Sequence, residues 1–204
     1  MNPGHCICAE LSAIRPSNQS AIAFKLALCL HVREKFKPSN TGKIFNIVYD
    51  SVLAIDSEPE SMKQLETLIE ENRNTCFVLF PSEDAVDTVE VAHLIKQRPL
   101  ILVPDGTWKQ AGRLVRNFPK EIPRVKINPK TLSRFLCRTQ TTLDRVCTAE
   151  AVALLLEDMG LQIEADRVFQ GLDIVQKGFN RQTFHQDERP LDQLKRRKPR
   201  ATSK

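Results

Sequence analysis

Short apolar runs alternate with amphipathic helical patterns along most of this chain. Four runs are nearly continuous in apolar residues, as expected of strands buried on both faces of a sheet: residues 21–30, 51–55, 75–80 and 100–103. Between and after them, apolar residues recur three and four positions apart, which predicts helices over residues 41–49, 60–72, 107–118 and 149–159. Weaker patterns predict an extended segment over residues 124–127 and a helix over residues 162–179. This alternation predicts an α/β fold with a mostly parallel sheet covered by helices.

The length of the chain, 204 residues, favours one compact catalytic or binding domain. We expect an N-terminal cysteine-bearing segment (residues 1–20), a main domain (residues 21–190) and a basic tail (residues 191–204). No apolar run approaches the ~20 residues of a membrane-spanning helix, and the N-terminus does not have the pattern of a signal peptide. We therefore expect a soluble, cytoplasmic protein without a membrane partner. The sequence predicts no oligomeric state.

Six cysteines lie mostly far apart, several of them inside apolar runs, which favours free thiols over disulfides. Cys6 and Cys8 form a Cys-x-Cys pair, which is too few ligands for a structural zinc ion, since such an ion takes four. A zinc site completed by His5 or His31 is the alternative to free thiols or a remnant hairpin. We expect no required metal.

Charge is distributed unevenly along the sequence. Residues 192–204 carry six basic residues and one acidic residue, against a net charge of +5 for the whole chain. Residues 50–90 hold eleven carboxylates and two basic residues, whereas residues 105–146 hold ten basic and three acidic residues. Clustered cations can bind phosphates with salt-dependent affinity, although a solvated face would show the same pattern. The tail has the same two interpretations, a nucleic-acid arm or a solubilising terminus.

Ligands of parallel sheets gather at the carboxyl ends of strands, so the loops that follow the predicted strands are the candidate site. These loops are residues 37–42, 81–84 and 104–108. Neither a dinucleotide-binding nor a P-loop glycine pattern is present. In the third loop, Asp105 precedes a predicted helix that carries Lys109, Arg113 and Arg116 on one face. Asp105 or Thr107 could equally be the N-cap of that helix, with Trp108 as a core anchor.

Four short motifs resemble one known family. Asp105-Gly-Thr-Trp108 resembles the D-x-T-W motif of the DTW-domain family of tRNA-uridine aminocarboxypropyltransferases. Lys37-Pro-Ser-Asn-Thr-Gly42, Phe80-Pro-Ser82 and Cys147-Thr-Ala-Glu-Ala151 resemble the other loop motifs of that family, in the expected order. Together the motifs span residues 6–159, and their joint occurrence is far more specific than any one of them.

The resemblance implies transfer of the 3-amino-3-carboxypropyl group of S-adenosyl-L-methionine to N3 of a tRNA uridine, with release of methylthioadenosine. S-adenosyl-L-methionine would be a co-substrate, tRNA the partner, and no metal would be needed. The family is similar to the ribosomal-RNA aminocarboxypropyltransferases, which implies a SPOUT-like fold with a trefoil knot. Three alternatives stay open: an S-adenosylmethionine-dependent RNA methyltransferase, a non-catalytic RNA-binding module, and an α/β scaffold with an exposed basic face. No residue selects the tRNA or the uridine position.

The resemblance also implies roles for individual residues. Uridine N3 carries a proton, so a base is the chemical minimum, and Asp105 is the catalytic candidate. Thr41 would take the carboxylate of the co-substrate at a helix start, a role compatible with Ser39 or Asn40 as N-cap. The candidate co-substrate-binding residues are Thr41, Ser82, Pro104, Gly106, Val125, Ile127, Cys147, Thr148 and Ala149.

Cations of the first loop and of the basic stretch 105–146 are the candidates for tRNA phosphates: Lys37, Lys109, Arg113, Arg116 and Arg138. Trp108 would form the pocket wall. Thr148 could also be the N-cap of the helix over residues 149–159, with Glu150 near its positive end.

Overall fold

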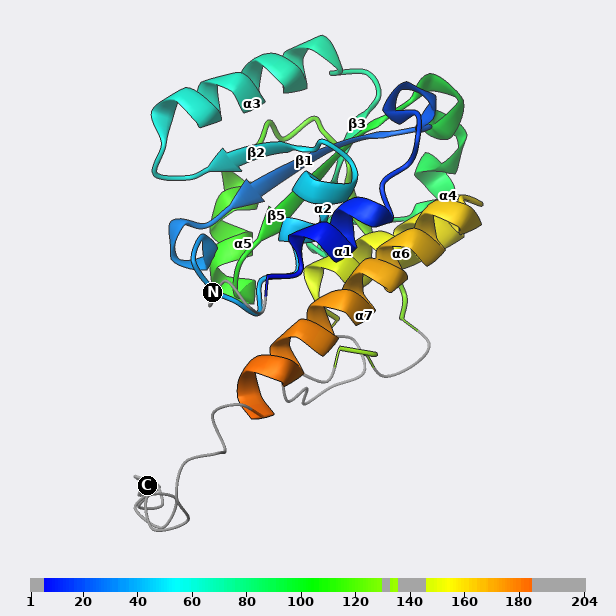
Figure 1. The fold of residues 1–204 in the computed structure, drawn as a ribbon. Helices are drawn as coiled ribbons and strands as arrows, with labels where there is room; N and C mark the ends of the chain where they lie inside the picture. Colours follow the sequence, from blue (N-terminus) through cyan, green and yellow to red (C-terminus); the bar gives the residue numbers. More distant parts are fainter. Residues whose placement is uncertain (1–5, 130–132, 136–145, 185–204) are drawn as a thin grey trace, which may run out of the picture.

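Six parallel strands form one sheet in the order β2-β1-β5-β3-β6-β4 (Figure 1). The computed structural model describes residues 6–129, 133–135 and 146–184. Arg138 and the basic tail therefore lie outside the described residues. The predicted α/β fold is confirmed, and the described part of the sheet is parallel throughout. The trefoil knot stays a prediction.

The strands are short and the helices vary widely in length. The strands are β1 (Lys25–Leu30), β2 (Val52–Ile55), β3 (Cys76–Leu79), β4 (Val86–Asp87), β5 (Leu100–Asp105) and β6 (Arg124–Lys126). The α-helices are α1 (Cys8–Ala13), α2 (Lys43–Val48), α3 (Pro59–Glu71), α4 (Thr88–Val91), α5 (Trp108–Arg116), α6 (Thr148–Asp158) and α7 (Gln162–Phe184). Three 3-10 helices complete the described elements: η2 (Gln19–Ala21), η3 (Val32–Glu34) and η4 (Ala92–Gln97). Among the residues described, no helix combines the length and the apolar character needed to span a bilayer.

Most element boundaries differ from the sequence-based expectation by one or two residues, and the start of the first strand and the end of the last helix differ by more. The first strand begins at Lys25 and not at residue 21, since η2 ends at Ala21 and residues 22–24 belong to neither a helix nor a strand. β5 continues two residues beyond Val103, since Pro104 and Asp105 pair in register with Cys29 and Leu30 of β1. The last helix is longer than predicted and ends at Phe184.

Alternate residues of the central strands pack into two different cores. Leu28 and Val103 belong to the core shared with α2, α6 and α7, whereas Cys29 and Leu102 belong to the core under α3 and α5. Figure 1 shows α3 on one side of the sheet and α1 and α7 on the other. Since side chains alternate along a strand, Asp105 is directed to the same side as Val103, toward α2 and α6.

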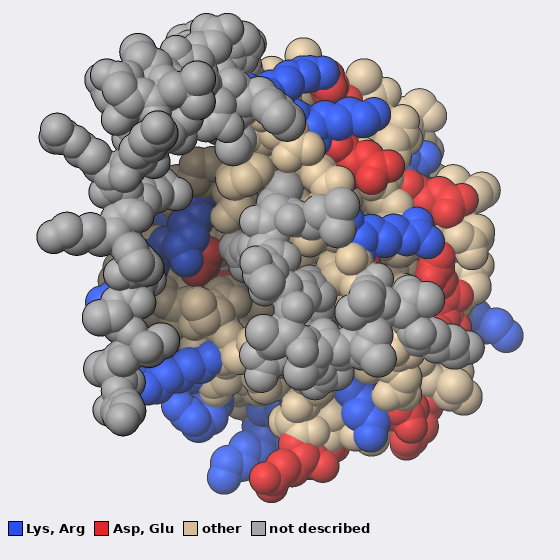
Figure 2. All heavy atoms as spheres, turned by 90° about the horizontal axis from the view of Figure 1, so that it is seen from below, with Lys and Arg blue, Asp and Glu red and all other residues tan. Residues whose placement is uncertain are grey.

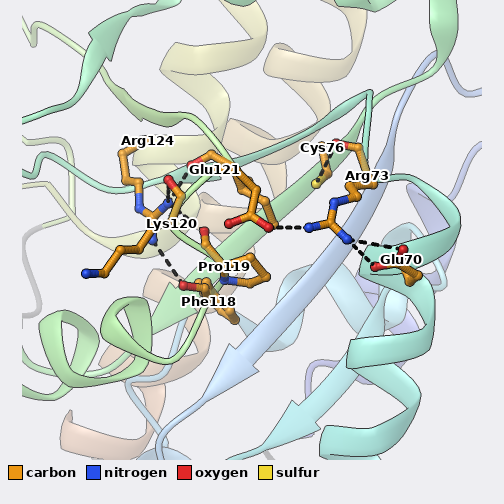
Figure 3. A network of polar contacts seen from close by, with 9 residues as sticks. Glu70, Arg73, Cys76, Phe118, Pro119, Lys120, Glu121 and Arg124 are labelled. Carbon is orange, nitrogen blue, oxygen red and sulfur yellow. Dashed lines mark hydrogen bonds and ion pairs between the residues drawn. The ribbon is translucent and has the colours of Figure 1, made fainter.

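A buried arginine fixes the turn between α5 and β6. The Arg124 guanidinium, in a residue only 7% exposed, donates to five backbone carbonyls at and beyond the end of α5: those of Val115, Phe118, Pro119, Lys120 and Ile122. Nearby, Arg73 joins Glu70 of α3 to Glu121 (Figure 3). These contacts anchor the end of α5 and the start of β6 at the amino-terminal ends of the strands, opposite to the predicted loops.

Candidate functional site

A cavity of about 880 Å³ lies at the carboxyl ends of β3, β5 and β6, between the starts of α5 and α6. Leu79, Val103 and Val125 give it apolar walls, and Thr107 and Thr148 contribute polar side chains. A cavity lined by both apolar and polar groups, at the carboxyl edge of a parallel sheet, is typical of a small-molecule site. Figure 2 looks onto this side of the molecule, where Lys and Arg side chains lie around a hollow.

Asp105 lies behind the wall of this cavity, at the end of β5. The residue is 5% exposed and is not part of the cavity lining. Asn40 Nδ2 donates to its Oδ2 and Thr148 Oγ1 donates to its Oδ1, each at 2.6 Å. The carboxylate thus joins three segments that are distant in sequence: the loop before α2, the exit of β5 and the start of α6.

Gly42 allows the loop before α2 to approach this carboxylate. A Cβ atom on Gly42 would lie 2.7 Å from Asp105 Oδ2 and 2.9 Å from Leu28 Cδ2. The φ angle of Gly42 is −60°, which any residue adopts, so the glycine is needed for space and not for backbone conformation. Lys43 follows, and burial lowers its pKa more than the nearby Asp105 charge raises it.

Thr41 supports the start of α6. Its side chain is buried, and its Oγ1 accepts a hydrogen bond of 3.3 Å from the backbone N–H of Ala149. The same hydroxyl bonds to the Cys147 thiol, whose pKa burial nevertheless raises to about 11. Cys147 lines the cavity, but at neutral pH it is a neutral thiol and not a nucleophile.

The structure changes the expected N-caps of two helices and confirms a third. α2 has Gly42 at its N-cap and no side-chain cap, so Ser39 and Asn40 do not cap it. The N-cap of α6 is Cys147, and the Thr148 hydroxyl bonds to Asp105 instead. The expected N-cap at Thr107 is present, in a capping box with Gln110.

Glu150 has a more specific role than helix-dipole stabilisation. It is buried in the first turn of α6, where it accepts hydrogen bonds from Ser133 Oγ and, at 2.8 Å, from the backbone N–H of Arg134. The Arg134 guanidinium lies 4.4 Å from the ring centroid of Phe169 in α7. Residues 133–135 are therefore anchored to α6 and α7.

Trp108 lines the cavity at the start of α5, and the cations of α5 lie further along the same helix. Trp108 is 45% exposed and packs against Phe80 at 6.0 Å between ring centroids, so it is not a buried core anchor. Lys109, Arg113 and Arg116 are exposed, and none of them forms a hydrogen bond or ion pair with a residue the structure describes.

The structure brings most of the predicted co-substrate residues to the cavity. Those in its lining are Pro104, Gly106, Val125, Ile127, Cys147 and Thr148, together with Trp108. Thr41 and Ala149 are buried behind it with Asp105, and Ser82 lies outside the lining. Lys37, Lys109, Arg113 and Arg116 also lie outside the lining, and Arg138 is not among the described residues. The roles of all these residues stay predictions.

Two residues of the loop before α2 have features that the sequence does not predict. Asn40 was considered only as a helix cap, yet it donates to Asp105. The sequence Asn-Thr-Gly does not by itself predict a hydrogen bond to Asp105, because the contact between this loop and the end of β5 is visible only in the structure. Phe36 in the same loop is 82% exposed, although a lone aromatic residue gives no such signal in a sequence.

The described cysteines, Cys6, Cys8, Cys29, Cys76 and Cys147, are free. Within residues 6–129, 133–135 and 146–184, no group of three or more His, Cys, Asp or Glu residues is placed to hold a metal ion. Burial raises the pKa of Cys29 to about 12, so its thiol is neutral in the physiological range. The Cys6 and Cys8 side chains are exposed, and a hydrogen bond from the Cys8 backbone, followed by one from the Cys8 side chain, lowers the pKa of Cys6.

The fold and the site together define an α/β domain whose ligand cavity lies at the carboxyl edge of a parallel sheet. The family model described as "DTW domain" matches residues 1–183, and the chain belongs to the DTW-domain family. The family predicted from the four motifs is thereby confirmed. Among solved structures, the SAM-dependent rRNA acp-transferase Tsr3 from Vulcanisaeta distributa is a distant likeness, with 16% identity, a TM-score of 0.48, and coverage of 80% of this chain and 82% of that chain.

Proposed function

We propose that this protein transfers the 3-amino-3-carboxypropyl group of S-adenosyl-L-methionine to N3 of a uridine in tRNA. The observation that carries the proposal is the position of the DTW motif. Asp105 ends β5 behind a cavity of about 880 Å³, and Gly106, Thr107 and Trp108 line that cavity. The family resemblance of this motif implies the reaction, and the cavity offers a place for it.

The cavity residues fit S-adenosylmethionine by size and chemistry. The volume is within the range of about 300–1,000 Å³ of small-molecule sites. Leu79, Val103 and Val125 would pack against adenosine, and the start of α6 would favour a carboxylate, as helix N-termini do. Thr41, behind the wall, would act on that carboxylate by holding the start of α6 in place. Bound there, the co-substrate supplies a carbon chain on a positively charged sulfur, which is a good leaving group.

The chain must remove the proton from uridine N3, and Asp105 does not reach the cavity directly. Thr148 does: it lines the cavity, and its Oγ1 donates to Asp105 Oδ1 at 2.6 Å. In our proposal the N3–H bond breaks as its proton passes to Thr148 Oγ1, whose own proton moves to Asp105 Oδ1. The freed lone pair of N3 forms the new N–C bond, and the electron pair of the broken C–S bond stays on the sulfur of methylthioadenosine.

The remaining contacts prepare Asp105 for this task. Asn40 holds its second oxygen at 2.6 Å, and Gly42 leaves room for the carboxylate. A fixed base within hydrogen-bond reach contributes about 10²- to 10⁴-fold to the rate of a proton transfer. Outside the cavity, the exposed cations of α5 (Lys109, Arg113 and Arg116) and Lys37 would contact tRNA phosphates.

The test uses two forms of S-adenosylmethionine, labelled either in the carboxyl group or in the methyl group. The purified protein should transfer the carboxyl label to tRNA, and the methyl label should not become attached to tRNA. Transfer of methyl label would replace the proposal with methylation, and binding of tRNA without either transfer would identify a non-catalytic module. Asp105→Asn should lose at least 100-fold in rate. Glu66→Gln, which changes an exposed carboxylate on α3, away from the candidate loops, is the matched control and should retain activity.

A further inference from the structure

Phe36 is the most exposed large apolar side chain in the described part of the protein, at 82% of its surface. It lies between η3 and α2, in the loop that follows β1. An aromatic ring in water forgoes the favourable burial available to it, so a ring held outward is a candidate contact for another molecule.

The loop around Phe36 is fixed on both sides of the ring. The backbone N–H of Val32 donates to Asp56 Oδ1 at 2.8 Å, and Lys35 pairs with Glu58 at 2.5 Å. After Phe36, the Lys37 side chain pairs with the buried carboxylate of Glu34. The Lys43 ammonium donates to the Lys37 carbonyl at 2.9 Å. These contacts present the ring to solvent on a braced loop.

Three cations, Arg33, Lys35 and Lys37, lie in the same segment as the ring, and Lys35 and Lys37 are paired with Glu58 and Glu34. The Lys35 ammonium lies 5.7 Å from the ring centroid of Phe36. Arg33 is exposed in the same segment and forms no side-chain bond with any residue that the structure describes. A flat aromatic face flanked by positive charge suits a nucleobase, because the base stacks on the ring while its phosphates lie near the cations. Binding of an apolar protein surface would instead remove water from these charges without pairing them, which costs free energy.

This loop begins beside the cavity. His31 N donates to the Asp105 carbonyl at 3.0 Å, and a Cβ on the cavity-lining Gly106 would lie 3.4 Å from His31 Cβ. The segment that carries Phe36 therefore follows directly from the rim of the candidate active site.

We propose that Phe36 is a stacking platform for an unpaired nucleobase of the RNA substrate, outside the cavity that takes the reacting uridine. This inference rests on the proposed function, because it assigns the ring to the same RNA. Stacking on an exposed ring is tolerant of base identity, so Phe36 would contribute affinity for unpaired RNA without selecting its sequence.

The test measures binding of the full-length protein to tRNA by fluorescence anisotropy over a range of salt concentrations. Phe36→Ala should weaken binding about 10-fold, the effect of losing one base stack, and Phe36→Trp should bind at least as tightly as the wild type. The slope of log affinity against log salt should not change, because a stacking contact releases no counterions. Val89→Ala is the matched control: Val89, in α4, is 80% exposed, and its loss should change affinity less than 2-fold.

A fully paired RNA duplex provides the second arm of the experiment. Phe36→Ala should leave duplex binding unchanged, because no unpaired base is present to stack. The melting temperature of Phe36→Ala should equal that of the wild type, since the ring is exposed.

Equal tRNA affinity of the wild type and Phe36→Ala would overturn the inference and leave the proposed function intact. Phe36-dependent self-association or protein capture, with unchanged RNA binding, would likewise replace it with a protein-docking role. A wild-type protein that neither binds nor modifies tRNA would instead contradict the proposed function itself.

Discussion

Substitution of Gly42 by alanine should destabilise the protein, because the added methyl group has no space. Its Cβ would lie 2.7 Å from Asp105 Oδ2, 2.9 Å from Leu28 Cδ2 and 3.2 Å from Asn40 Oδ1. Forcing an extra carbon into a well-packed site costs about 1–3 kcal/mol. The φ of −60° suits alanine, so the smaller entropy of the unfolded chain returns roughly 0.4–1 kcal/mol. We expect a net loss of about 1–2 kcal/mol in the free energy of unfolding.

Gly112→Ala is the matched control. Gly112 lies within α5, and a Cβ there would meet Phe80 Cζ at 3.6 Å, an ordinary contact. Because alanine favours the helix, this variant should gain about 0.5–1 kcal/mol. Urea unfolding followed by circular dichroism measures both changes from the midpoint at constant slope. If Gly42→Ala were as stable as the wild type, the close approach of the loop to Asp105 would be refuted.

Three further predictions concern other parts of the molecule. Thr148→Val should slow the transfer about 100-fold, whereas Thr148→Ser should stay active. Because the N3 proton of 5-fluorouridine is more acidic, tRNA containing this base should partly restore the rate of Thr148→Val. The affinity of Thr148→Val for S-adenosylmethionine, measured by calorimetry, should be unchanged, and a lost affinity would indicate a structural role instead of a proton relay. Arg124→Met should lower the free energy of unfolding by about 2–4 kcal/mol, because carbonyls that Arg124 satisfies lose their donor; an unchanged urea midpoint would contradict this. Cys147, with its pKa raised to about 11 by burial, should resist iodoacetamide at pH 8 while Cys6 reacts, and rapid alkylation of Cys147 in the folded protein by mass spectrometry would show that the cavity wall is open.

The pH dependence of stability follows from the same thiol. The unfolded Cys147 ionises near its ordinary pKa of 9.0, whereas the folded one keeps its proton to about pH 11. The unfolded state therefore binds fewer protons between these values, and the contribution of this thiol to stability is present below pH 9 and lost as the pH rises toward 11. Cys147→Ala should reduce the loss of stability over this range, which urea unfolding at pH 8 and pH 10 can measure.

The fold class followed from the sequence because its strands are buried on both sides. β3 and β5 are buried along their full length, so β3 and the first four residues of β5 appear as continuous apolar runs without alternation. β4 gives no such signal, since it has two residues, one of them exposed. α1 and α4 contain six and four residues, too few for a helical period to be recognised.

The end of β5 was underestimated for a physical reason. Pro104 lacks an N–H, and Asp105 disfavours strands, so residues 104–105 look like a loop in the sequence. In the structure, these residues pair in register with Cys29 and Leu30 of β1. The strand therefore carries Asp105 to the side that faces α2 and α6.

The sequence predicted which motifs matter, but not how they connect. Asn40 and Thr148 are 108 residues apart, and each donates to a different oxygen of Asp105. Local patterns predict helix caps for both residues, because side chains of their type cap helices in most settings. The order of strands places the loop after β1 beside the end of β5, and the packing of α6 brings Thr148 to the same carboxylate; neither can be read from local sequence.

Analysis of tRNA nucleosides by liquid chromatography and mass spectrometry tests the central claim most directly. Cells that contain this gene should yield a uridine heavier by one aminocarboxypropyl group. Cells without the gene should lack it, and the wild-type protein, but not Asp105→Asn, should restore it. The account would be contradicted if the modified uridine were equally abundant with and without the gene, or if the missing nucleoside carried a methyl group instead.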